Sequence, residues 1–77
     1  RGVVHVSYGL RASTPVRVSV YDVRGREVAI LHDGLDDAGP HAMTWSPKAA
    51  AHLGRGAYFV VLRTSGARDV RRVIVLQ

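Results

Sequence analysis

The stretch "VSVYDVRGREVAIL", residues 18–31, places two apolar, β-branched runs on either side of a short charged segment. In and just before the first run, Val16, Val18 and Val20 alternate with other residues. This two-residue period is typical of a strand with one buried face. The charged segment between the runs, residues 22–27, is either a turn or a small site that holds an acid close to a base.

The chemistry of the charged segment favours a turn. Asp22 can accept hydrogen bonds from backbone N–H groups two residues on, and Gly25 can adopt a positive φ angle without steric cost. Together they predict a type I turn closed by a left-handed residue with a bulge. Arg24, Arg26 and Glu27 then point into water. Because a catalytic carboxylate pair needs a pocket, we expect no active site at this corner.

The two-residue period continues along the chain and predicts six strands. They cover residues 4–8, 16–21, 27–33, 41–46, 57–64 and 68–77. Gly, Pro and Asp mark the connections at 9–15, 34–40 and 65–67, and residues 47–56 have room for one or two helical turns. Because no segment can supply the helix of a βαβ crossover, we predict an all-β fold, an antiparallel sandwich of about six to seven short strands.

The large apolar side chains predict where the core lies. Met43, Trp45 and Tyr58 fall within strands, and side chains of this size dominate burial in small domains. The alternative is that exposed aromatic rings stack against sugars, as in carbohydrate-binding modules. We therefore keep a carbohydrate-binding or structural accessory module as a second hypothesis.

Length and charge limit the function classes. Seventy-seven residues allow one domain, 1–77, and the absence of cysteine excludes disulfides and thiolate metal sites. Ten of the eleven basic side chains are arginine, but they are scattered, which argues against a nucleic-acid face. No apolar run approaches the ~20 residues of a transmembrane segment. Since no initiator Met or signal peptide opens the chain, we expect a module of a larger protein.

The chemistry-bearing residues do not form a known catalytic or metal-binding pattern. The four histidines, at positions 5, 32, 41 and 52, lack the short spacings of a zinc site, and we expect His5 and His41 at the surface. No serine stands in a Gly-x-Ser-x-Gly elbow, and no glycine-rich loop ends in the Lys-Ser/Thr of a phosphate loop. We therefore predict a protein that is not an enzyme and needs no cofactor or metal.

The closing strand carries the candidate recognition site. Its four residues Val73, Ile74, Val75 and Leu76 are apolar on both faces, and Arg71 and Arg72 precede them. At a sheet edge, this strand would offer unpaired backbone groups, charge and an apolar row to a receptor. The arginines can equally be gatekeepers that prevent aggregation at the edge. Both interpretations stay open at this point.

The order of four short motifs resembles a known family. They are Val-x-Val-Tyr-Asp-x-x-Gly-Arg-x-Val-x-x-Leu (18–31), Ala-Gly-x-His-x-x-x-Trp (38–45), Gly-x-Tyr-Phe-x-x-Leu-x (56–63) and Arg-Arg-Val-Ile-Val-Leu (71–76). This order is similar to that of the C-terminal sorting domains of the type IX secretion system, and of the related Ig-like domain of flagellar hook-capping proteins. The matching residues are Asp22, Gly25, Arg26, Trp45, Gly56, Tyr58, Arg71 and Arg72.

The resemblance implies a non-catalytic label on a secreted cargo protein. In that family an Ig-like β-sandwich follows an unrelated cargo domain. The secretion machinery of the outer membrane recognises the sandwich, and a cell-surface peptidase commonly removes it while the cargo is released or attached to lipopolysaccharide. The resemblance also places such a module at the extreme C-terminus, and here the chain ends at Gln77. The implied location is secreted or cell-surface, after passage through the periplasm.

Overall fold

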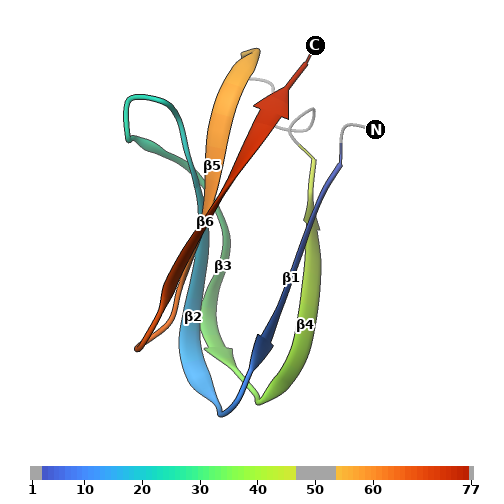
Figure 1. Ribbon diagram of the computed structural model, residues 1–77, viewed down its shortest axis with the longest axis vertical. Coiled ribbons are helices and arrows are strands. Elements are labelled where there is room, and N and C mark those ends of the chain that lie inside the picture. Colours follow the sequence, from blue (N-terminus) through green and yellow to red (C-terminus); the bar gives the residue numbers. More distant parts are fainter. Residues whose placement is uncertain (1–2, 47–53, 77) are drawn as a thin grey trace.

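The computed structural model describes residues 3–46 and 54–76, which form six strands and no helix (Figure 1). The strands are β1 (Val4–Leu10), β2 (Thr14–Tyr21), β3 (Glu27–Asp36), β4 (Gly39–Trp45), β5 (Gly56–Arg63) and β6 (Arg68–Val75). All paired strands are antiparallel. β1 and β4 form a two-stranded sheet, and the order β3-β2-β5-β6 forms a four-stranded sheet. The predicted all-β sandwich is confirmed.

β2 holds the centre of the larger sheet because it pairs with β3 on one side and β5 on the other. Its alternating valines face the smaller sheet: Val16 is 1% exposed, and Val18 and Val20 are fully buried. These are the most deeply buried side chains among the described residues. The alternation seen in the sequence therefore identifies both the strand and its buried face.

Aromatic packing joins the two sheets. Trp45 at the end of β4 lies edge-to-face against Tyr58 of β5, with ring centroids 6.5 Å apart and planes inclined by 71°. Both side chains are 7% exposed, and the Tyr58 hydroxyl donates a hydrogen bond to the carbonyl of Gly54 at 2.8 Å. The half-buried Met43 packs against this core. The prediction that these side chains form the core is confirmed.

Two predicted connections are shorter than expected, so their boundaries were wrong. β3 continues through residues 34–36, and β4 already begins at Gly39. Likewise β1 continues to Leu10, and β2 begins at Thr14. The ends are held by long-range contacts that the local sequence does not reveal, since Tyr8 of β1 donates a hydrogen bond to Asp36 of β3. The helical turn predicted within residues 47–56 lies largely outside the described residues.

The turn between β2 and β3 has the predicted chemistry. Asp22 Oδ1 accepts hydrogen bonds from the backbone N–H groups of Arg24 (2.9 Å) and Arg26 (3.0 Å), and Gly25 has φ +83°. The backbone bonds to Arg26 and Arg24 are the main reason that the pKa of Asp22 lies below its ordinary value. Arg24, Arg26 and Glu27 are all exposed, as predicted, and the last two also make ionic contacts. Arg26 Nε contacts Asp22 Oδ2 at 3.1 Å, and Glu27 accepts bonds from Arg17.

Candidate functional site

The closing strand β6 is an edge of the four-stranded sheet, which is the position that the recognition hypothesis requires. It pairs with β5 without a register shift, from Arg68 opposite Arg63 to Val75 opposite Gly56. Gly56 has φ +147°, a conformation that favours glycine at the start of β5. Among the described strands, only β5 pairs with β6, so the backbone groups along the other edge of β6 form a regular row that is open to a partner.

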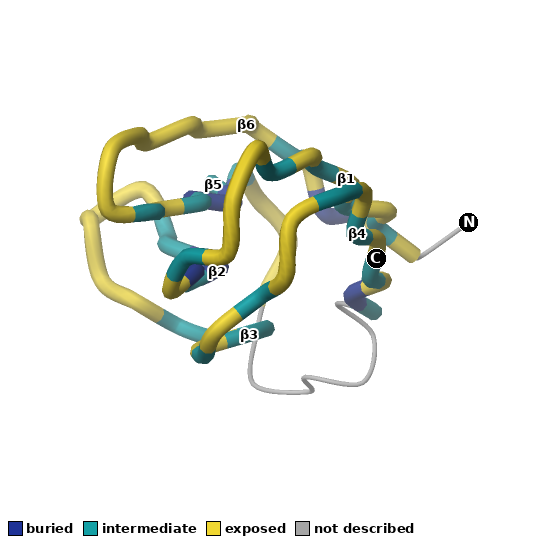
Figure 2. The backbone as a smooth tube through the Cα atoms, turned by 90° about the horizontal axis from the view of Figure 1, so that it is seen from below, coloured by how far each residue is buried: buried dark blue, intermediate teal, exposed yellow. Residues whose placement is uncertain are grey.

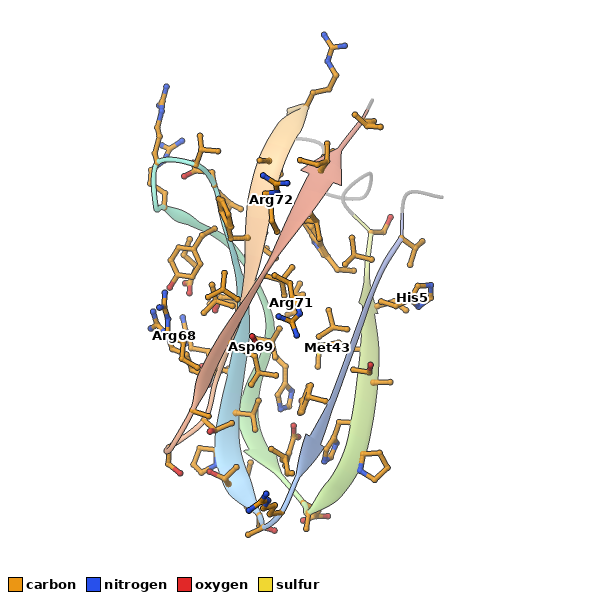
Figure 3. The ribbon with its side chains drawn as sticks, viewed as in Figure 1. His5, Met43, Arg68, Asp69, Arg71 and Arg72 are labelled. Carbon is orange, nitrogen blue, oxygen red and sulfur yellow. The ribbon has the colours of Figure 1, made fainter. Side chains whose placement is uncertain are left out.

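The strand geometry separates the two adjacent arginines. Successive side chains of a strand point to opposite faces, and Arg71 lies opposite the core residue Val60, whereas Arg72 lies opposite Phe59. Arg71 and Asp69 emerge from β6 on the side that faces β1, and Arg68 emerges on the other side (Figure 3). We use "outer face" for the surface of the four-stranded sheet turned away from β1 and β4. Arg71 and Arg72 therefore do not form one basic patch.

The apolar residues of the closing strand are divided in the same way. Val75 is 5% exposed and Val73 is half-buried, and both pack in or against the core. Ile74 is 57% exposed and Leu76 is 83% exposed. The strand is thus apolar on both faces, as the sequence indicates, but only one face is covered. Figure 2 shows β6 as one of the most exposed strands along its length.

Three arginines lie side by side across the outer face. Arg17 of β2 lies opposite Arg63 of β5, and Arg63 lies opposite Arg68 of β6. Like charges directly opposite one another in a sheet are destabilising. Arg17 is neutralised by Glu27 at 3.0 Å and Asp33 at 2.8 Å, both from β3. These two contacts compensate the positive charge of Arg17, the arginine of the row that lies nearest β3.

The β6 side of this row has no such neutralisation. Within residues 3–46 and 54–76, no carboxylate lies in ion-pair range of Arg63, Arg68 or Arg72, and all three side chains are exposed. On the opposite face of β6, by contrast, Arg71 Nη1 contacts Asp69 Oδ1 at 3.2 Å. The uncompensated positive charge of the edge strand therefore belongs to the outer face.

A shallow groove of about 320 Å³ lies beside these cations on the outer face. Its lining includes the two basic residues Arg63 and Arg68, the acidic residue Asp22, and a set of small, apolar or aromatic residues: Tyr21, Val23, Gly25, Phe59, Val61 and Val70. Val61 is almost fully buried and Phe59 half-buried, so this part of the outer face has an apolar floor. The groove therefore combines an apolar floor with two basic residues and one acidic residue.

Sequence reasoning missed the contribution of Arg63 and Arg68. These residues flank the turn at 64–67, where the Thr64 N–H donates to the Ala67 carbonyl at 2.9 Å. Counting outward from that turn would have placed the two arginines opposite each other. No local signal could have added Arg17, because β2 and β5 are far apart in the sequence.

A second polar cluster joins the sheets at the end of the sandwich formed by the 11–13 and 37–38 turns. The Tyr8 hydroxyl donates to Asp36 Oδ2 at 2.5 Å, and the Tyr8 ring stacks on His41 with centroids 5.4 Å apart. His41 is therefore half-buried and not simply exposed as predicted, while His5 is exposed. His32 Nε2 lies 2.9 Å from Asp36 Oδ1, within ion-pair distance but outside hydrogen-bond geometry.

This cluster has a structural electrostatic effect. Burial and the bond to Asp36 raise the pKa of Tyr8 to about 12, and the same bond is the main reason that the pKa of Asp36 lies below its ordinary value. In the described part of the chain, no three His, Asp or Glu side chains are arranged to hold a metal ion. The cluster thus acts as a polar link between β1 and β3.

Comparisons with known proteins add no assignment. No family model matches the chain, and no curated protein or solved structure matches it. Across the described residues, no helix has the length and apolar character needed to cross a membrane.

Proposed function

We propose that this chain is a non-catalytic module that targets a fused cargo protein for outer-membrane export and cell-surface attachment. The observation that carries the proposal is the exposed edge strand β6, which combines a regular backbone edge, cations and the exposed apolar side chains of Ile74 and Leu76. An added strand gains affinity from main-chain hydrogen bonds and specificity from alternate side chains. The motif order that resembles type IX sorting domains supports the same function.

The remaining motif residues have structural roles that suit a stable label. Asp22 and Gly25 form the β2–β3 turn, and Tyr58 packs on Trp45 between the sheets. Trp45 is only 7% exposed, which leaves little ring surface for a sugar, so the carbohydrate-binding alternative loses its strongest candidate. An export module read by a protein receptor is the function that these contacts favour.

A reporter fusion tests the proposal. A periplasmic fluorescent protein followed by residues 1–77 is expressed in a host that has the secretion machinery and in the same host with the machinery deleted. We expect surface or medium delivery only in the first host. Retention of a folded fusion in the periplasm of both hosts would overturn the proposal and favour a structural accessory module.

A further inference from the structure

The outer face of β6 presents a repeating chemical pattern to any strand that joins it. Arg68, Val70 and Arg72 alternate along this face, with a cation, an apolar side chain and a second cation. Val70 is 38% exposed, lies opposite Val61 of β5, and lines the groove together with it. Side chains directly opposite in neighbouring strands have Cβ atoms about 4.5–5.5 Å apart, which is within reach of a guanidinium–carboxylate contact.

We propose that β6 binds an extended acidic segment of a partner protein as an added strand. The segment carries acidic side chains opposite Arg68 and Arg72 and an apolar side chain opposite Val70. This inference rests on the proposed function, in which β6 is the edge that is recognised, and it names the chemistry of the partner. Carboxylates suit these positions because the planar guanidinium group binds them through two parallel N–H donors.

The two faces of β6 explain why the outer face determines the partner. On the face towards β1, Asp69 already neutralises Arg71, so a partner gains little charge compensation there. On the outer face, Arg68 lies beside Arg63 without a carboxylate from the described residues. A partner carboxylate near Arg68 would relieve the repulsion within this pair.

The same charges oppose the pairing of β6 with a second copy of itself in the register centred on Val70. In an antiparallel pair centred on Val70, Arg68 of one copy would lie opposite Arg72 of the other. Like charges at both positions oppose this pairing, which is how natural edge strands avoid aggregation. The gatekeeper interpretation and the recognition interpretation therefore agree: charge that rejects another β6 selects an acidic strand.

The other edge of the four-stranded sheet is less suited to an added strand. β3 pairs with β2 through two register shifts, between Val18 and Ser19 and between Val20 and Tyr21. Such bulges twist an edge and disrupt its regular row of backbone groups. β3 also places Glu27 and Asp33 on the outer face, where they would repel an acidic segment.

A peptide titration tests the inference without any secretion machinery. The 77-residue chain, labelled with ¹⁵N, is titrated with the peptide TETVTET and with its basic counterpart TKTVTKT. We expect TETVTET to shift the amide signals of β6, and to bind more weakly as ionic strength rises from about 0.01 M to about 0.15 M. Equal binding of the two peptides, no binding of TETVTET, or shifts confined to β1 or β3 would overturn the inference.

Charge reversal supplies the matched control. The double variant Arg68→Glu/Arg72→Glu should bind TETVTET about tenfold more weakly and should now prefer TKTVTKT, a reversal that mere structural damage cannot produce. Arg24→Glu/Arg55→Glu changes the net charge equally at two exposed positions outside β6 and should bind like the original chain. If both double variants lose the same affinity, net charge and not β6 is responsible, and the inference fails.

The two proposals can fail separately. Export that depends on the machinery, together with a chain that ignores TETVTET, would leave the export function standing and refute the acidic partner. Binding of TETVTET by β6 without export would support the edge chemistry and refute the export function.

Discussion

Replacing Trp45 by alanine should remove a large share of the stability of the protein. Trp45 is 7% exposed and contacts Tyr58 across the two sheets. A buried tryptophan removes on the order of 200 Å² from water, which corresponds to about 5 kcal/mol at about 25 cal/mol per Å². Because unfolded chains already bury part of this area, that value is an upper bound. We expect Trp45→Ala to lower the free energy of unfolding by about 3–5 kcal/mol.

This loss is large against the whole stability of a chain of this length, which is about 4–12 kcal/mol. The assay is urea unfolding followed by far-ultraviolet circular dichroism, since Trp45→Ala removes the only tryptophan and its fluorescence. Trp45→Phe keeps an aromatic ring and should lose about 1.5 kcal/mol, whereas Val23→Ala, at a side chain that is 71% exposed, should stay within about 0.5 kcal/mol.

A loss below about 1 kcal/mol for Trp45→Ala would refute the core assignment. It would mean that the indole ring contributes little to folding. The ring could then serve as a binding platform, and the carbohydrate-binding hypothesis would return. The same experiment therefore measures packing and tests whether the Trp45 ring is available to a ligand.

Three further predictions concern the turn and the polar contacts. Gly25→Ala should lower the free energy of unfolding by about 1–2 kcal/mol, because alanine is strained at the φ angle of +83°. No atom lies within 4 Å of the added Cβ, so the backbone strain is the whole effect. An unchanged thermal midpoint would contradict this. Folding raises the pKa of Tyr8 from 10.0 to about 12, so the contribution of Tyr8 to the free energy of unfolding is complete below pH 10.0 and is lost as pH rises through about 12. Tyr8→Phe should remove this loss of stability at alkaline pH. Folding lowers the pKa of Asp36, so the contribution of Asp36 to the free energy of unfolding is present above the ordinary pKa of 3.8 and is lost at more acidic pH. Unfolding curves of the original chain and of Tyr8→Phe, recorded across pH, test both effects; curves with the same pH dependence would contradict them. Arg17→Met should raise the pKa of Glu27, which the Ser19 hydroxyl first and the Arg17 guanidinium second hold below the ordinary value; an unshifted carboxyl signal in an NMR titration would show that Arg17 has no such effect.

Local signals were sufficient for much of the fold. The alternation of Val16, Val18 and Val20 identifies β2 and its buried face, because a two-residue period matches the geometry of a half-buried strand. The turn residues Asp22 and Gly25 predict the β2–β3 hairpin, because their chemistry acts within a few residues. Both features depend on neighbours in the sequence.

The features that the sequence did not reveal depend on pairing between distant segments. β3 extends through Gly34 to Asp36 although these residues resemble a turn, since Asp36 is held by Tyr8 from another sheet. The basic row across the outer face arises only when β2 lies beside β5. The adjacent Arg71 and Arg72 suggest one basic site, but a strand directs them to opposite faces.

The measurement that tests the central claim most directly is the export of a reporter carrying matched charge-reversal variants. The claim is that β6 is the surface that is recognised. Fusions to the original chain, to Arg68→Glu/Arg72→Glu and to Arg24→Glu/Arg55→Glu are compared for surface delivery, after circular dichroism has established that each is folded. The account predicts that delivery is lost only with the β6 variant. Equal delivery by all three folded fusions would contradict it.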